Sequence, residues 1–523
     1  MGKPYNLSQN AELSVNKTQD ARMPAGIPYI IGNEAAERFS FYGMKAILTT
    51  FLIDRFFIHT AANQQVAEAQ ANEQTHFFIS LAYLMPLIGG FLADRYFGKY
   101  KVILYVSIIY CLGHACLAAF DNNLAGFTLG LLLIAIGAGG IKPCVSANVG
   151  DQFDENNKYL IPKAFSLFYL SINFGAFFSQ ILIPQIYGGK PENGALAFGI
   201  PGILMALATL IFFLGRNNYR RLPPTGPNPE NFLSITAYAL RNRSKQQAGQ
   251  SFIDTAKAAF SSEAVEGVKA VWKVLAVFAF IPVFWALYDQ NGSEWVLQAR
   301  KMDLNVPLFN FTMQAEQVQS INAILILVLT PLFGFWLYPM LEKRGIAVTA
   351  MRKLSVGFLL TLLSFVVIAY IQMLIDAGQQ PNVVWQFLAY FILTAGEVLI
   401  SITGLEYAYT QAPPSMKSTL MSFWLLTVAS GNFIVSKINN NIEHGGMLAN
   451  MLNGANYYWF FIALIGINTV LYFLMLRNQK SEKHFGGFEL FFAGIFVVLS
   501  AIVIVTSSIA VVQDIGKIIS EFV

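Results

Sequence analysis

The sequence predicts an all-α polytopic membrane protein, built as two six-helix bundles with one further transmembrane helix at the carboxyl end. Two observations lead to this fold class. The 523 residues are 55% hydrophobic and only 12% charged, whereas charged residues make up about 25% of soluble proteins. Predominantly apolar windows of about 20 residues, the length that crosses a bilayer as a helix, also recur along the chain.

The apolar windows fall into two sets of six, separated by one polar stretch. The first set comprises residues 28–56, 77–93, 102–120, 124–144, 164–187 and 198–214. The polar stretch, 216–266, contains a run rich in proline and glycine at 222–229, which indicates a linker. The second set comprises residues 270–288, 321–340, 354–375, 383–409, 419–435 and 457–476. Six spans, a linker and six spans is the plan of the major facilitator carriers.

A last apolar run, residues 488–512, is long enough to form a thirteenth span. The predicted domains are a cytoplasmic amino-terminal tail (1–26), an amino-terminal bundle (27–215), a cytoplasmic linker (216–266), a carboxyl-terminal bundle (267–478) and the extra helix (479–523). Lysine and arginine favour cytoplasmic loops, and here they crowd the loops on the side of the amino terminus. We therefore expect a multi-pass protein of the plasma membrane, the inner membrane in a bacterium, with its amino terminus in the cytoplasm.

Charge and cysteine content exclude several other classes. The net charge of +4 is small and its basic residues are spread among loops, which argues against nucleic-acid binding. The three cysteines, Cys111, Cys116 and Cys144, lie in apolar segments without metal-ligand or disulfide spacing. We predict no metal, no cofactor and no obligate protein partner, so that the chain is a monomer in the lipid bilayer.

Ionisable side chains inside the apolar stretches indicate a transport path. There are eight: Glu34, Glu37, Arg38, Lys45, Lys142, Asp289, Glu397 and Glu406. A charge in the middle of a bilayer costs about 2.5–3.5 kcal/mol, so such residues face protein, water or an opposite charge. The signs of these residues balance if the helices pack around one shared polar cavity.

The first helix carries the densest group of these charges. Glu34, Glu37, Arg38, Phe41 and Lys45 share one face of a helix, which we expect to line the cavity. The arginine fork suits a carboxylate in two-point contact, whereas a buried glutamate can exchange a proton near neutral pH. The alternative is a self-neutralising patch that only holds the bundle together.

Motifs in both halves carry a resemblance to a known family. The run E-A-A-E-R-F-S-F-Y-G, residues 34–43, resembles the E-x-x-E-R-F-x-Y-Y-G signature of the proton-dependent oligopeptide transporters of the major facilitator superfamily, with Phe41 in place of the first tyrosine. G-G-I-K-P-C-V-S-A-N at 139–148 and F-Y-L-S-I-N-F-G at 168–175 resemble further signatures of that family. In the second half, F-W-A-L-Y-D-Q-N-G-S at 284–293 and G-E-V-L-I-S-I-T-G-L-E at 396–406 extend the similarity. With His76, these two stretches resemble the mammalian intestinal peptide carrier more than many bacterial members.

The resemblance implies roles for the charged residues. Arg38 and Lys142 would bind the carboxylate of a peptide and Glu397 its amine, while Lys142 and Glu397 would also form a cytoplasmic gate. Lys45 and Asp289 would form the outer gate, although Asp289 can instead cap a helix end. Glu34, Glu37, His76 and Asp289 would couple protons, with a purely structural histidine as the alternative for His76.

Uncharged polar and aromatic residues complete the predicted site. Asn173 and Asn322 can donate and accept hydrogen bonds, which suits the amide groups of a peptide. Aromatic walls accept side chains of varied shape. The resemblance selects four such walls: Tyr42, Tyr83, Trp285 and Trp424.

These features predict a proton-coupled symporter, not an enzyme, that imports di- and tripeptides by alternating access. A symporter of the same family for another small solute, such as nitrate or an amino-acid conjugate, is the first alternative, since a fold does not determine a substrate. An intramembrane hydrolase that uses His76 is a remote one, because the sequence has neither an H-E-x-x-H motif nor a glycine-flanked nucleophilic serine.

Overall fold

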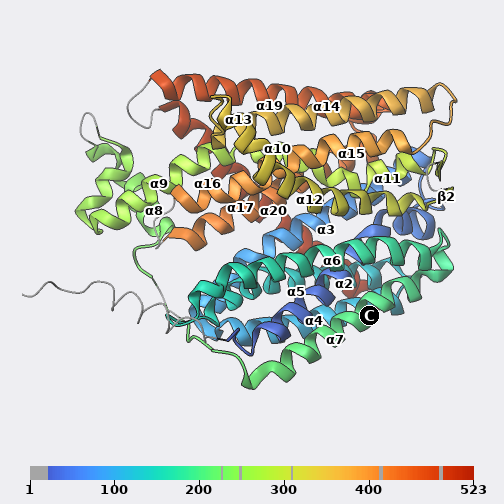
Figure 1. The fold of residues 1–523 in the computed structure, drawn as a ribbon. Coiled ribbons are helices and arrows are strands. Elements are labelled where there is room, and N and C mark those ends of the chain that lie inside the picture. The colour runs from blue at the N-terminus through green and yellow to red at the C-terminus, as the bar shows by residue number, and fades with distance from the viewer. Residues whose placement is uncertain are drawn as a thin grey trace, which may run out of the picture.

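The computed structural model describes residues 22–224, 226, 228–246, 250–307, 310–411, 416–481 and 487–522. Most of the tail expected over residues 1–26 and parts of the linker therefore lie outside the described residues. Two groups of long helices lie side by side, coloured blue to green and yellow to red in Figure 1. The predicted fold class is confirmed.

The first group, the N-bundle, consists of α2 (Ile27–Leu52), α3 (Gln64–Leu92), α4 (Lys99–Ala119), α5 (Leu124–Asp151), α6 (Ile161–Tyr187) and α7 (Gly194–Leu214). Here α2 packs against α6 and α7, and α5 packs against α3 and α4. We call the end of the bundles at which α2 begins the near end, and the end at which α2 stops and α3 begins the far end.

The second group, the C-bundle, consists of α9 (Ser262–Phe278), α10 (Ile281–Tyr288), α11 (Glu294–Ala299), α12 (Ser320–Leu332), α13 (Tyr338–Lys343), α14 (Ala350–Asp376), α15 (Val384–Glu397), α16 (Thr403–Gln411), α17 (Lys417–Glu443), α18 (Met447–Met451) and α19 (Ala455–Ser481). The strands β1 (Asn305–Val306) and β2 (Phe311–Thr312) form a small antiparallel pair between α11 and α12.

Short helical turns join or extend these helices. Four are π-helical: Ile53–Phe57, Ala93–Phe97, Phe333–Leu337 and Val398–Ile402. Others are 3₁₀ turns: Lys158–Leu160, Pro191–Asn193, Gly215–Asn217, Arg243–Lys245, Phe252–Ala258, Asp289–Gly292 and Ala315–Gln319. Glu397 directly precedes one π-turn, and π-turns inside helices are frequent at functional sites.

The described residues contain eleven helices long and apolar enough to cross a membrane, and a bent pair makes a twelfth. The bent pair is the seventh predicted span. Instead of one straight helix over 270–288, α9 and the helical segment Ile281–Ala299 meet at 44°, just before Pro282. Helix α2 is also long, but Glu34, Glu37, Arg38 and Lys45 all lie within twelve of its residues.

Helix α3 begins 13 residues before the predicted span 77–93 and places His76 inside a helix instead of at its edge. Asn63 caps it by accepting a hydrogen bond from the Val66 amide. Several polar side chains of residues 64–76, among them Gln65, Asn72 and His76, contact the C-bundle. Because this segment is polar, a search for apolar windows does not detect it as part of the helix.

The polar linker is packed on the C-bundle. Its helix α8 (Phe232–Arg241) is amphipathic, and its apolar face joins the hydrophobic core of the C-bundle. The Phe232 ring lies 5.2 Å from that of Phe423, and Trp272 Nε1 donates a hydrogen bond to Thr236.

The last helix, α20 (Gly487–Phe522), crosses from one bundle to the other. Near its start Phe492 and Phe496 belong to the C-bundle core, with the Phe492 ring 4.8 Å from that of Phe280. Near its end Ile518 belongs to the N-bundle core, and the carboxyl end lies beside that bundle in Figure 1. This helix therefore contacts both bundles.

Candidate functional site

Arg38 is held by two carboxylates of its own helix. Its Nε lies 2.6 Å from Glu34 Oε1 and 3.3 Å from Glu37 Oε2; both glutamate side chains are buried and the Arg38 side chain is 13% exposed. Helical spacing brings Glu34 and Arg38 together, because residues four apart are neighbours on one face. Gly175 of α6 allows close packing here, since a Cβ at that position would lie 2.4 Å from the Ala35 carbonyl oxygen.

The patch on α2 neutralises itself only in part. Two glutamates face one arginine, and the Lys45 ammonium lies 3.1 Å from Asp289 of the C-bundle. Neither Glu37 oxygen accepts a well-aligned hydrogen bond from the described residues. Glu37 does interact electrostatically with Lys142, so the charge balance extends beyond α2.

Lys142 of α5 is held by aromatic rings. Its buried Nζ has no hydrogen-bond partner among the described residues and lies 4.2 Å from the centre of the Phe41 ring and 3.9 Å from that of Tyr83. A cation over aromatic faces gains about 0.5–2 kcal/mol. An ion pair between Lys142 and Glu397 is not formed in this conformation, and that gate stays a prediction.

Glu397 lies at the end of α15 in a polar cluster of the C-bundle. Asn322 Nδ2 donates hydrogen bonds to Glu397 Oε2 (2.8 Å) and to Thr394 Oγ1 (3.0 Å), while its Oδ1 accepts one from the Tyr288 hydroxyl (3.2 Å). Asn322 therefore positions the Glu397 carboxylate. Asn173 on α6 instead donates to the Tyr169 carbonyl of its own helix.

The four predicted aromatic walls divide between the bundles. Tyr42 and Tyr83 belong to α2 and α3, whereas Trp285 and Trp424 belong to α10 and α17, with ring centres 6.1 Å apart. Gly404 makes room for Trp424, since a Cβ there would lie 2.2 Å from the indole. The Tyr42 hydroxyl interacts electrostatically with both Arg38 and Glu397, which places the cations of one bundle and the acid of the other around it.

A buried network connects the predicted outer gate to His76. Asn432 Nδ2 donates to Asp289 Oδ2 (2.7 Å), and Asn432 Oδ1 meets His76 Nδ1 (2.7 Å). The other ring nitrogen of His76 meets the Ser293 hydroxyl at 2.9 Å. Both carboxylate oxygens of Asp289 thus bind side chains of other helices, which does not fit a simple helix cap.

Further polar contacts between the bundles gather at the far end. Arg300 forms a two-point contact with Asp54, both distances being 2.8 Å, and also binds Glu316. Lys301 lies 3.0 Å from Glu68, and Asn72 donates to Glu294 at 2.5 Å. These contacts hold the two bundles together at this end.

Sequence reasoning placed one acid wrongly and missed several polar residues. Glu406 does not join the cluster: its side chain is 61% exposed and lies 3.1 Å from Lys353. Asn432, Ser293 and Asn72 were missed. A polar side chain within an apolar span is a signal that could have identified Asn432, because buried amides need partners.

Known proteins resemble this chain in sequence. The family model described as the POT family matches residues 100–453. Human solute carrier family 15 member 2 is 37% identical over 402 residues, covering 73% of this chain and 54% of the human protein. Human solute carrier family 15 member 1 is 32% identical over 493 residues, covering 88% and 66%. The chain thus spans about half to two thirds of the length of these relatives.

Solved structures are similar as well. The crystal structure of the POT family transporter PepTSo superposes with a TM-score of 0.80 at 36% identity and covers 89% of this chain and all of that one. The crystal structure of an auto-inhibited POT family peptide transporter gives a TM-score of 0.79 at 37% identity, covering 89% and 98%. The chain is a multi-pass membrane protein that belongs to the POT family, the family of the proton-dependent oligopeptide transporters.

Proposed function

We propose that this chain is a proton-coupled symporter that imports di- and tripeptides by alternating access of its two bundles. The observation that carries this proposal is the electrostatic interaction of Tyr42 with Arg38 of its own bundle and with Glu397 of the C-bundle, while Lys142 lies over the Tyr83 ring in the N-bundle. A free peptide has one charge of each sign at a short separation. Such a substrate would bind both bundles at once.

Membership in a family of peptide carriers supports the same reading, and the human relatives named above belong to it. Nitrate has no amine, so it gives no reason for a buried carboxylate held by Asn322. We therefore favour peptides over the nitrate alternative. The roles of Arg38, Lys142, Glu397 and the four aromatic residues are part of this proposal.

The proton path is assigned to the buried acids and the histidine. Glu34, Glu37, His76 and Asp289 are each nine-tenths or more buried, and two of them lie in the network with Lys45. Protonation of Asp289 would weaken its pair with Lys45 and favour opening of the far end. Asp289 suits the coupling of proton binding to opening, because its ion pair with Lys45 can form and break.

The orientation follows from the loop charges. With the amino terminus in the cytoplasm, the far end faces outward and the present conformation is closed to the outside. We propose the plasma membrane, or the inner membrane of a bacterium, as the location, and a monomer as the oligomeric state. We also propose that the domains of the chain end at residues 26, 215, 266 and 478.

Competition in liposomes tests the substrate class. Vesicles preloaded with dialanine would exchange it for labelled dialanine outside, and three unlabelled competitors would be added: dialanine, its amino-acetylated form and its carboxyl amide. We expect dialanine to compete at least about tenfold better than either blocked form, because each block removes one charged contact of about 1.5–3 kcal/mol. Equal competition by all three, or by nitrate, would contradict the proposal.

A further inference from the structure

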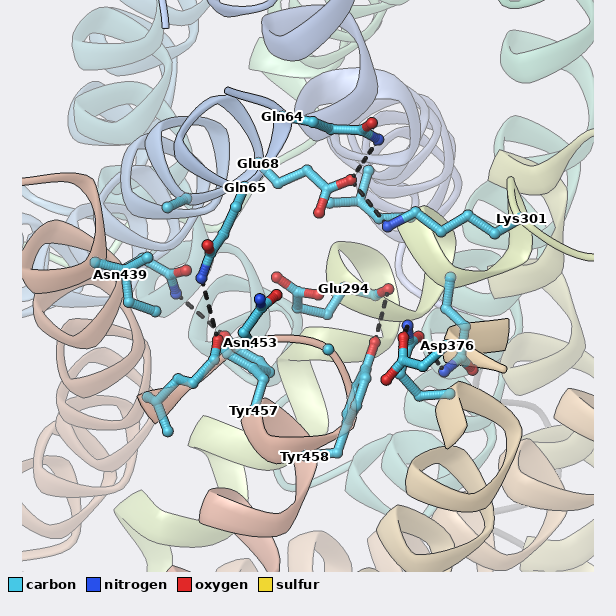
Figure 2. A pocket seen from close by; sticks show the side chains of 17 residues that line it. Gln64, Gln65, Glu68, Glu294, Lys301, Asp376, Asn439, Asn453, Tyr457 and Tyr458 are labelled. Carbon is cyan, nitrogen blue, oxygen red and sulfur yellow. Dashed lines mark hydrogen bonds and ion pairs between the residues drawn. The ribbon is translucent and has the colours of Figure 1, made fainter. Parts of the chain in front are cut away.

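A cavity of about 230 Å³ opens at the far end between α3 of the N-bundle and α11, α14, α17 and α19 of the C-bundle. Figure 2 shows Glu294 in this cavity, between Glu68 and Tyr458. The cavity is separate from the cluster around Arg38 and Glu397. The acidic residues that line the cavity differ in their hydrogen-bond and ion-pair partners.

Two of the acids have cations or backbone amides as partners. Glu68 lies 3.0 Å from Lys301, and Asp376 accepts hydrogen bonds from Gln372 and from the Ala455 amide. Glu294 has no lysine, arginine or histidine nitrogen within 4 Å among the described residues. Its carboxylate accepts a hydrogen bond from Asn72 Nδ2 at 2.5 Å.

The side-chain oxygen of Asn72 has no hydrogen-bond partner among the described residues. Its side chain is fully buried, and its Oδ1 accepts no hydrogen bond from the described residues. A carboxylate can only accept, whereas a carboxylic acid can also donate. Protonation of Glu294 therefore supplies the donor that Asn72 Oδ1 requires, and the amide and the acid can then form two hydrogen bonds instead of one.

The two partners belong to different bundles. Asn72 lies on α3, one turn before His76, and Glu294 follows Ser293, the residue that meets His76 Nε2. The pair joins the two bundles, so separation of the bundles at the far end would break it. A proton bound by Glu294 is thus held more tightly in the closed conformation than in one in which the bundles separate there.

We propose that Glu294 binds the transported proton and that Asn72 completes this proton site only in the conformation closed at the far end. A ligand shifts a conformational equilibrium by its difference in affinity for the two states. A proton on Glu294 would therefore favour closure at the far end and release of substrate at the near side, whereas a proton on Asp289 favours opening of the far end, so the two acids would act at different steps of the cycle. This inference rests on the proposed proton-coupled transport and adds a group outside the predicted proton-coupling set.

The charged and titratable groups around Glu294 lie on α3, α14 and α19 and just after α11, whereas α17 lines the cavity with Asn439 and Ile442, which do not titrate. The titratable groups are Glu68 of α3, Lys301 after α11, Asp376 of α14, the hydroxyls of Tyr457 and Tyr458 of α19, and His76 deeper along α3. A test must therefore separate Glu294 from the other acids of the cavity. Asp376→Asn is the matched control, because it removes the same charge from the same cavity while its hydrogen bonds stay within the C-bundle.

Purified wild type, Glu294→Gln and Asp376→Asn would be compared in liposomes by two assays of labelled dialanine. The first is uptake driven by an acid exterior, across a series of external pH values. The second is exchange with internal dialanine at equal pH, which needs no net proton movement. For Glu294→Gln we expect the acid stimulation of uptake to fall about fivefold or more, within the usual range of coupling between two ligands, with exchange preserved. Asp376→Asn should keep both activities.

A second variant keeps the test decisive if Glu294→Gln folds poorly. Asn72→Ala leaves the acid in place and removes its partner, so the pH at which uptake is half-maximal should shift. Unchanged acid stimulation in Glu294→Gln, or an equal loss in Asp376→Asn, would overturn the role of Glu294 while leaving symport intact. Parallel loss of exchange and acid-driven uptake in Glu294→Gln, with an unchanged pH midpoint in Asn72→Ala, would also overturn it. Absence of acid-driven uptake in the wild type would overturn both proposals.

Discussion

Arg38 and Lys142 are cations of the same bundle, but they are held in different ways. Two carboxylates bind Arg38, whereas Lys142 lies between two rings. A charge-assisted ion pair in a buried site is stronger than a cation–π contact. In the proposed mechanism Lys142 is therefore the cation that exchanges partners, first a substrate carboxylate and later Glu397.

Replacement of Lys142 by alanine should abolish proton-driven accumulation of dialanine. The variant removes the charge that both the substrate and the predicted inner gate require. The measurement is uptake into liposomes with an acid exterior, and Lys158→Ala, an exposed lysine, is the control. Undiminished accumulation would remove Lys142 from the mechanism.

Replacement of Glu397 by glutamine should weaken binding of dialanine by about tenfold or more, the cost of one charge-assisted hydrogen bond. Binding of amino-acetylated dialanine should change much less, because that ligand lacks the cationic amine. Glu406→Gln is a matched control, since Glu406 is exposed and bound to Lys353. An equal loss for both ligands would contradict the assignment of Glu397 to the amine.

At the scale of elements, α20 is the helix that the known family plan of twelve spans does not require. Its first turns pack against Phe280 and Phe423, and its last turns reach the N-bundle core. No residue of the predicted site lies on it. In a membrane, lipid tails can cover the apolar faces that it leaves, so helix packing is lost without exposure to water.

A chain that ends at residue 486 should therefore fold and still exchange dialanine. Its melting temperature should be lower, because the contacts that bridge the bundles are lost. Thermal unfolding in detergent and exchange in liposomes are the two measurements. Complete loss of exchange in a folded truncated protein would show that α20 takes part in transport.

The 3₁₀ turn Phe252–Ala258 of the linker depends on one aspartate. Asp254 accepts a hydrogen bond from the Ser251 amide in a capping box and lies within 3.0 Å of Lys257 and Lys269. Partial burial raises the pKa of Asp254, but these two ammonium groups outweigh that effect and hold the pKa below its usual value. The linker is thus stabilised by the ionised form.

This stabilisation should be complete above the usual aspartate pKa of about 3.9 and should disappear as the pH falls through the lower folded value. Asp254→Ala should cost about 0.5–1.5 kcal/mol at neutral pH, the net value of one intramolecular hydrogen bond. Amide hydrogen exchange of residues 252–258 measures both effects. Equal protection of the wild type and the variant at pH 7 would contradict this role.

At the scale of the whole molecule, the sequence predicted the fold class, the helices and most of the charged residues that lie together. Apolar windows and buried charges are local signals, and both reflect the membrane as solvent. Glu406 was misplaced because it resembles Glu397 in every local respect. Only packing distinguishes them, with Glu397 8% exposed and the Glu406 side chain 61% exposed.

The contacts between the bundles could not be predicted in this way. His76 and Asn432 are 356 positions apart, and the polar start of α3 has the composition of a loop. Its polar side chains are accounted for by partners on the other bundle, such as Glu294 and Ser293. The bend of the seventh span was missed for a similar reason, since a window average does not register where a helix breaks.

Accumulation of labelled dialanine by the purified protein in liposomes, with an acid exterior, tests proton-coupled import most directly. We expect intact dialanine to rise inside above its external concentration and this excess to disappear when a protonophore is added. Uptake that only reaches the external concentration, or accumulation that survives the protonophore, would contradict proton symport.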